Sequence, residues 1–280
     1  MIVDTHTHLY DPARPQGIPW PNKDNEQLYR TVLPEHFKQT AGPSGVTHTV
    51  VVEASLWVDD NDWILDLAKD EPAIVGFVGN LDSQEPDYIG TLDRLSKNPI
   101  FRGVRLRRKE LERASDPTTL AAIRALSDRD LEMDLLANPS DFAAIAAIAG
   151  AIPDLRIVCN HVAHVVIDGN APDPEWVAGL HRIASHPNVF MKVSGFVERA
   201  KEQPAPVDPE YYKPSFDAMW ETLGEDRLIY GSNWPVCERA ADYVTVFNIA
   251  NTYFSDKGEP AKEKYFVENG RRAYKWIERK

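Results

Sequence analysis

The run Ile2-Val3-Asp4-Thr5-His6-Thr7-His8 opens the chain, and its first half is typical of a β-strand. Seven further short runs of β-branched and apolar residues follow, and some are continuously apolar, as in Val50-Val51-Val52. Strands that are covered on both faces of a parallel sheet have this pattern. The eight predicted strands are Ile2–Thr5, Thr47–Glu53, Ile74–Gly79, Phe101–Leu106, Leu131–Leu135, Arg156–Asn160, Val189–Val193 and Leu228–Tyr230.

Segments with helical patterns separate these runs. Asp116 can cap a helix that has Pro117 at its first position, which is a common arrangement at helix starts. The tail Lys262–Lys280 is predicted to form a terminal helix that packs on the other elements. The remaining predicted helices are Asp60–Lys69, Pro117–Ser127, Ser140–Ala149, Pro174–Ser185 and Ser215–Leu223.

Strand alternating with helix eight times predicts an α/β fold, a (β/α)8 TIM barrel that forms one domain over residues 1–280. An open doubly wound sheet is the alternative. It lacks support, because neither GxGxxG nor GxxxxGK[ST] follows any predicted strand.

Composition excludes several function classes. The net charge of −12 argues against nucleic-acid or anionic-membrane binding, since both require a basic face. No apolar run is long enough to span a membrane, and the first residues do not resemble a signal peptide. The two cysteines, Cys159 and Cys237, fit a reducing cytoplasm. We therefore expect a cytoplasmic protein whose partner is a small molecule; a homo-oligomer stays open.

His6 and His8 give the sharpest local signal. Residues two apart on a strand point to the same side, so these side chains should project together near the strand end. Two imidazoles on one side can hold one divalent metal. Asp4 would lie on the same side and could orient a ligand. The alternative is a pair of polar histidines at a strand end without a chemical role.

Two segments, Tyr10–Pro34 and Glu198–Pro214, are rich in proline and break the regular pattern. Both follow the carboxyl end of a predicted strand, which is the active-site face of such barrels. We expect them to form lids or walls of a pocket.

The opening Val3-Asp4-Thr5-His6-Thr7-His8 resembles the first strand of the amidohydrolase superfamily. Later stretches narrow the resemblance to its amidohydrolase-related branch, which contains sugar-acid lactonases and 2-pyrone-4,6-dicarboxylate lactonase. These stretches occur in the family's order across nearly the whole chain: Gly76–Asp82, Phe101–Arg105, Val158–His161, Met191–Gly195, Tyr230–Val236 and Asn269–Tyr274.

The resemblance implies hydrolysis by a water that a metal or a base activates. It implies that His161, after the sixth strand, lies close to His6 and His8. His161 would either complete a divalent metal site with them, with zinc expected, or contact the carbonyl under attack. His164 is a weaker candidate for the same site.

Asn233 departs from the family pattern, which has an aspartate there as the general base. An amide cannot act as a base at neutral pH. Three alternatives follow: another base such as Glu53 or His161, weak activity through unassisted metal-bound hydroxide, or a non-catalytic protein that binds a similar ligand.

Arginines are the predicted substrate anchors. The resemblance places Arg105, at the end of the fourth strand, on a substrate carboxylate, which suits the paired donors of guanidinium. Arg199 resembles a second anion-binding arginine. Arg107, Arg108 and Lys109 are expected to be solvated. The sequence thus predicts a hydrolase of a small oxygen-rich compound, most simply a lactonase, with decarboxylation and amide hydrolysis as alternatives.

Overall fold

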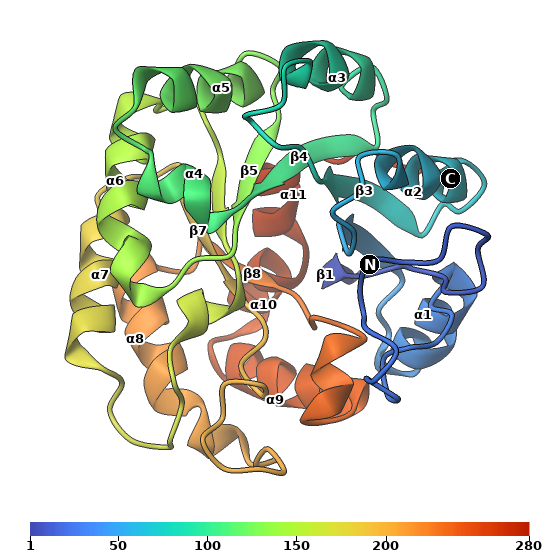
Figure 1. Ribbon diagram of the computed structural model, residues 1–280. Helices are drawn as coiled ribbons and strands as arrows, with labels where there is room; N and C mark the ends of the chain where they lie inside the picture. Colours follow the sequence, from blue (N-terminus) through green and yellow to red (C-terminus); the bar gives the residue numbers. More distant parts are fainter. Residues whose placement is uncertain (280) are drawn as a thin grey trace.

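The computed structural model describes residues 1–279 and confirms the predicted barrel (Figure 1). Eight parallel strands pair in the order of the sequence, β1 with β2 through to β7 with β8. Their cores are fully buried, because helices cover the outer face and side chains fill the interior. The strands are β1 (Val3–Thr7), β2 (His48–Val52), β3 (Ile74–Gly79), β4 (Phe101–Leu106), β5 (Glu132–Leu135), β6 (Ile157–Cys159), β7 (Val189–Val193) and β8 (Leu228–Tyr230).

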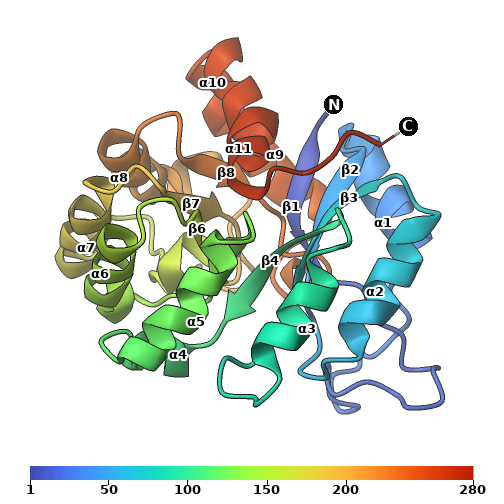
Figure 2. The ribbon, with the colours of Figure 1, turned by 90° about the horizontal axis from the view of Figure 1, so that it is seen from above.

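A ring of helices surrounds the strands, as Figure 2 shows from above. The predicted cap on α5 is present, since the Asp116 side chain accepts a hydrogen bond of 2.7 Å from the backbone N–H of Thr118. The helices are α1 (Pro34–Ala41), α2 (Asp60–Lys69), α3 (Tyr88–Leu95), α4 (Arg108–Glu112), α5 (Pro117–Ser127), α6 (Phe142–Ala151), α7 (Pro174–Ala184), α8 (Lys213–Leu223), α9 (Tyr243–Asp256), α10 (Glu259–Glu263) and α11 (Asn269–Tyr274).

The barrel closes between β8 and β1 at the carboxyl ends of the strands. The backbone N–H of Asn233 donates to the His6 carbonyl at 3.0 Å, and that of His8 donates to the Trp234 carbonyl at 2.9 Å. These bonds bring the residues after β8 beside the end of β1. Asn233 and the His6–His8 segment are therefore neighbours in space.

The predicted terminal helix over Lys262–Lys280 is confirmed as far as Tyr274, but its predicted end is wrong. The chain forms α10, a π-helical turn at Lys264–Glu268 and α11, and the helix ends where Lys275 adopts a left-handed φ of 49°. Lys280 lies outside the described residues. The tail does pack on the barrel, because Tyr274 and Trp276 join an apolar cluster with residues of the strands.

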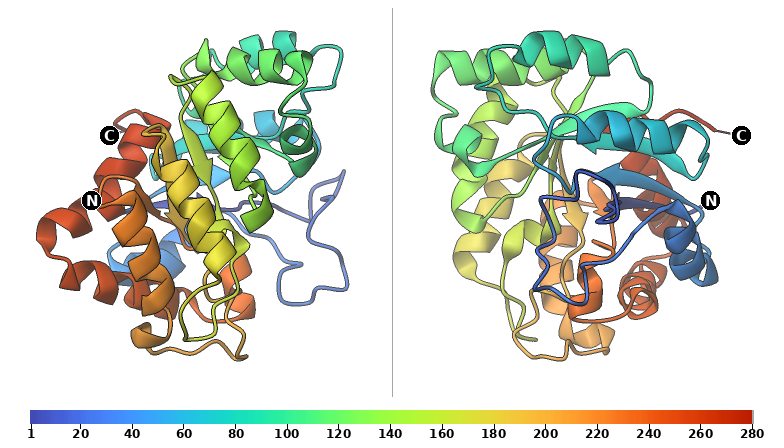
Figure 3. Two further views of the ribbon diagram at one scale, coloured as in Figure 1. Left: turned by 90° about the vertical axis from the view of Figure 1, so that its left-hand side faces the viewer. Right: turned by 45° about the vertical axis from the view of Figure 1, so that its right-hand side comes forward.

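The segment between β1 and α1 follows the barrel as a long loop, drawn in dark blue in Figure 3. It contains no regular helix or strand. Between residues 1 and 279, no helix is both long and apolar enough to pass through a bilayer.

Candidate active site

A cavity of about 540 Å³ is lined by residues that follow the carboxyl ends of several strands. This is the face on which barrels of this type place their chemistry. Its lining includes histidines, carboxylates and arginines, and its volume suits a small ligand. The polar side chains that line it are those of His8, Asn22, Glu53, Arg105, His161, His164, Glu198, Arg199, Asn233 and Arg239.

The first strand contributes its two histidines at different depths. His8 lines the cavity, whereas His6 is completely buried and is absent from the cavity lining. The two rings lie 5.0 Å apart between centroids, and the ring of His6 lies 4.3 Å from that of His161. The sequence correctly predicted that the three histidines cluster, but only His8 and His161 border the cavity.

Asp4 does not have the predicted role of orienting a histidine ring. Its Oδ1 accepts from the backbone N–H groups of His6 and Ser232 at 3.0 and 2.9 Å, and its Oδ2 accepts from the Tyr243 hydroxyl on α9 at 2.9 Å. The register of β1 shifts between Asp4 and Thr7. This irregularity breaks the simple alternation of sides, and Asp4 ties β1 to β8 and α9.

Lys192 on β7 contacts the His6 ring and bears on which ring nitrogen carries the proton. Its Nζ lies 3.1 Å from His6 Nδ1 and 3.2 Å from Asp134 Oδ2, and the lysine is fully buried. Burial lowers the pKa of Lys192 and Asp134 raises it. With Lys192 as an ammonium, which only donates, Nδ1 accepts and Nε2 holds the ring proton. His6 Nε2 is buried and has no hydrogen-bond partner within residues 1–279.

His161 begins an unusual turn. His161, Val162, Ala163 and His164 all have positive φ, between 49° and 55°, a conformation that costs roughly 1–2 kcal/mol per non-glycine residue. The turn places His161 and His164 together on the cavity wall. The Ser194 hydroxyl pairs with His161 Nδ1 at 3.0 Å and fixes the orientation of the ring.

The cavity histidines are held in the neutral form. Burial, with Arg105 next in importance, lowers the pKa of His8 to about 4. Burial and the nearby positive charge of Arg199 lower the pKa of His164 to about 4. The pKa values of His6 and His161 also lie well below the usual range, chiefly through burial. Neutral imidazoles are weak bases but can still donate one hydrogen bond each.

The histidines as placed do not fit a three-ligand zinc site. A ligating nitrogen needs a free lone pair, and with Lys192 as an ammonium His6 Nε2 carries the ring proton instead. Across residues 1–279, no three His, Cys, Asp or Glu side chains converge closely enough to hold a metal ion. The sequence-based prediction of zinc on His6, His8 and His161 thus lacks support from these positions, and metal analysis tests it.

Asn233, in a left-handed conformation with φ of 63°, projects its side chain into the cavity wall. Its Nδ2 donates to Glu198 Oε1 at 2.6 Å. The other oxygen, Glu198 Oε2, is buried and is left without a hydrogen-bond partner in the described chain. Burial raises the pKa of Glu198 to about 7, against the lowering effect of the Asn233 hydrogen bond.

Glu53 is a second carboxylate in the same cavity. Its Oε1 lies 3.7 Å from Arg105 Nη1, and both side chains are 13% exposed. Burial raises the pKa of Glu53 to about 7, although Arg105 and Arg107 lower it. The structure therefore places Glu53, predicted as an alternative base, and the predicted substrate anchors Arg105 and Arg199 around one cavity.

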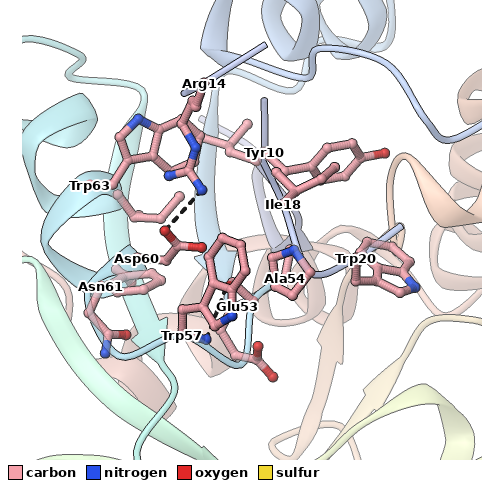
Figure 4. A pocket seen from close by; sticks show the side chains of 15 residues that line it. Tyr10, Arg14, Ile18, Trp20, Glu53, Ala54, Trp57, Asp60, Asn61 and Trp63 are labelled. Atoms are coloured by element: carbon pink, nitrogen blue, oxygen red, sulfur yellow. Dashed lines mark hydrogen bonds and ion pairs between the residues drawn. The ribbon is translucent and has the colours of Figure 1, made fainter. Parts of the chain in front are cut away.

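The loop after β1 forms part of the cavity wall, as the sequence predicts, through Pro19, Trp20 and Asn22. Figure 4 shows how it is anchored beside a smaller cavity of about 20 Å³. Arg14 pairs with Asp60 on α2 at 2.9 Å. Its guanidinium also lies 4.3 Å from the centroid of the Trp63 ring. These buried contacts fix the loop against the barrel.

Some sequence predictions placed residues differently from the structure. Arg107 is half-buried and donates to Asn80 Oδ1, so it is not simply solvated. Sequence reasoning missed the carboxylate of Glu198, which it identified only as the start of a loop. The absence of an aspartate at position 233 was the available signal, because it required an acid from elsewhere.

Comparisons with known proteins identify the family of the chain. The family model described as amidohydrolase matches residues 3–276. The chain is 32% identical over 244 residues to an L-fucono-1,5-lactonase of Burkholderia ambifaria, covering 86% of this chain and 82% of that protein.

Solved structures share the fold. A Burkholderia multivorans amidohydrolase crystallised with bound zinc has a TM-score of 0.87 at 22% identity, covering 99% of this chain and 100% of that one. A probable 2-pyrone-4,6-dicarboxylic acid hydrolase from Acinetobacter baumannii with bound citric acid has a TM-score of 0.78 at 17% identity, covering 98% and 99%. On the family match and the 32% relative, the chain belongs to the amidohydrolase family.

Proposed function

We propose that the protein hydrolyses the lactone of a small, oxygen-rich acid to the open hydroxy acid. The observation that supports this proposal is that two largely buried carboxylates, Glu53 and Glu198, lie with arginines and neutral histidines around one cavity of about 540 Å³. Ester hydrolysis needs a base for water, donors for the carbonyl oxygen and contacts that orient the ring. The cavity holds candidates for each task.

In this mechanism the arginines and histidines bind and orient the substrate. Arg105 presents paired donors to a carboxylate or to neighbouring hydroxyls of the lactone. Arg199 and Arg239 add positive charge to the same cavity. His8 and His161 are neutral and face the carbonyl. One of the two carboxylates removes a proton from the attacking water, and no step passes through a metal.

The relatives support the choice of substrate class. The Burkholderia ambifaria protein at 32% identity is an L-fucono-1,5-lactonase, and this chain covers most of its length. A sugar lactone has one reactive ester and several hydroxyls, and the charged and polar side chains of the cavity can bind these groups. A cytoplasmic location is part of the proposal, and it agrees with Cys159 and Cys237 being buried and unpaired.

The test is a panel of 1,4- and 1,5-lactones of six-carbon sugar acids. Hydrolysis of each lactone is measured as proton release in weakly buffered solution. We expect hydrolysis of at least one lactone with kcat/KM of about 10⁴ M⁻¹s⁻¹ or more, which is the lower range of natural enzymes. His161→Asn is the matched loss-of-function variant, and its kcat/KM should fall at least about tenfold.

The same panel is run on Asn233→Asp, which restores the family's usual acid. If neither protein hydrolyses any lactone, the lactonase proposal fails. If only the aspartate variant is active, the natural chain is a ligand-binding relative. Hydrolysis by the natural chain shows that Asn233 is compatible with catalysis.

A further inference from the structure

We propose that Glu198 is the general base of this site and that Asn233 positions it. The inference rests on the proposed lactone hydrolysis and names the residue that activates water. The aspartate expected after β8 is absent, and in its place an amide holds a carboxylate that comes from the segment after β7. The carboxylate of the site thus comes from the segment after β7 instead of the segment after β8.

The contacts of Glu198 leave one oxygen available for a water. Oε1 accepts the 2.6 Å hydrogen bond from Asn233 Nδ2, which fixes the plane of the carboxylate. Oε2 is buried and has no partner in residues 1–279, and the Glu198 residue lines the cavity. Burying a carboxylate oxygen without a hydrogen-bond donor costs free energy. An unpaired oxygen of this kind is therefore more easily explained at a catalytic or binding site than elsewhere in the fold.

The backbone holds the positioning residue firmly. Asn233 donates its N–H to the His6 carbonyl, and its carbonyl accepts from the N–H of Cys237 at 3.0 Å. Its left-handed φ is one that asparagine tolerates better than most residues. The amide is therefore fixed between β1 and the turn after β8, and it presents Nδ2 to Glu198.

Glu53, the other carboxylate, is less suited to the task. It lies 3.7 Å from the guanidinium of Arg105, a cation that favours its ionised form and competes for its lone pairs. Glu198 has a neutral amide as its hydrogen-bonded partner instead. We therefore assign Glu53 to orienting Arg105 and Glu198 to proton transfer.

The pKa values suit a base but do not separate the two carboxylates, because burial raises the pKa of Glu53 to about 7 as well. Burial raises the pKa of Glu198 to about 7, so its carboxylate is a stronger base than an ordinary glutamate near neutral pH. Arg199 and Arg239 act in the opposite direction on this group. His8, with a pKa lowered to about 4, is a weaker base than either carboxylate.

The step balances without a further reactant. Glu198 Oε2 takes one proton from water as the water oxygen bonds to the lactone carbonyl carbon. The bond between that carbon and the ring oxygen then breaks, and the departing oxygen takes the proton back from Glu198. The product is the open hydroxy acid, which ionises in solution, and Glu198 returns to the carboxylate.

The experiment compares Glu198→Gln with the double variant Glu198→Gln plus Asn233→Asp, on the lactone that the natural chain hydrolyses fastest. The single variant should lose about 10²- to 10⁴-fold in kcat with KM changed by less than about threefold. The double variant exchanges amide and carboxylate across the same hydrogen bond. It should regain at least about tenfold of the lost kcat.

Two further variants control for the loss of a nearby carboxylate and for misfolding. Glu202→Gln removes an exposed carboxylate from the same segment and should keep the activity of the natural chain. If circular dichroism shows that Glu198→Gln does not fold, Glu198→Asp replaces it. Glu198→Asp should then lower kcat more than Glu53→Gln does.

Two results would overturn the inference while lactone hydrolysis itself stands: a Glu198→Gln variant with kcat close to that of the natural chain, or a double variant no faster than the single one. A natural chain that hydrolyses no lactone refutes the proposed function first and removes the inference with it.

Discussion

The mouth and the buried interior of the barrel contain similar charged residues in opposite situations. In the interior, Lys192 and Asp134 form a fully buried pair at 3.2 Å, and the Tyr274 hydroxyl donates to the second Asp134 oxygen at 3.0 Å. At the mouth, Glu198 keeps one oxygen without a partner in the described residues and lines a cavity. Charges in the interior are paired with one another, and charges at the mouth are available to a ligand.

The two regions meet at His6. Its ring lies beneath the cavity, and its Nδ1 contacts the Lys192 ammonium of the buried pair. The buried pair in the interior therefore acts on the protonation of a ring that lies directly beneath the site. Glu132, next to this pair, is the exception there, because burial and Asp134 raise its pKa well above the usual range.

The largest expected effect is on stability, from Lys192→Met. The change leaves the Asp134 carboxylate buried without its cation, and such a loss costs about 3–5 kcal/mol. Urea denaturation followed by tryptophan fluorescence measures it. Lys201→Met is the control at the mouth side, where an exposed ion pair at 3.8 Å should be worth less than about 1 kcal/mol. Equal stabilities of the two variants would contradict the contrast between interior and mouth.

The next effect is on substrate binding, from Arg105→Gln. Losing charge-assisted hydrogen bonds costs about 1.5–3 kcal/mol, so kcat/KM should fall about 10- to 100-fold, mostly through KM. Steady-state kinetics on the preferred lactone measure this. Arg108→Gln, an exposed arginine on α4, is the matched control and should change neither constant. A fall in kcat alone would place Arg105 in the chemical step instead.

A smaller effect concerns the pH dependence of stability. Burial lowers the pKa of His164 to about 4 in the folded protein, below the 6.5 of a free histidine. Its contribution is therefore fully present above pH 6.5 and is lost as pH falls toward 4. His164→Gln should flatten the decline of the unfolding free energy over this window. Urea midpoints at several pH values, with the exposed His181→Gln as control, test this; parallel curves would refute it.

The smallest expected effect is that of metal removal. Because Lys192 leaves His6 Nε2 protonated, dialysis against a chelator should leave kcat within about twofold of its starting value. Metal analysis of the purified protein should find far less than one zinc per chain. Stoichiometric zinc, with activity lost on chelation and regained on zinc addition, would restore the three-histidine metal site and overturn the inferred tautomer.

Local patterns in the sequence predicted much of the fold. Continuous apolar runs such as Val50–Val52 are buried strands, and Asp116 before Pro117 caps a helix, because burial on both faces and capping depend on near neighbours. The terminal helix was overestimated, since its end depends on the packing of Tyr274 and Trp276 into the barrel.

The candidate site divides in the same way. The sequence by itself determined that His6, His8, His161 and Arg105 gather at one face, because each follows or ends a parallel strand. Only the tertiary structure decided what they can do. Glu198 contacts Asn233, 35 residues away in the sequence, and Lys192 contacts His6, 186 residues away. The first contact engages one carboxylate oxygen of Glu198, and the second engages one ring nitrogen of His6. Such partners are set by barrel closure and burial, which no local pattern of residues contains.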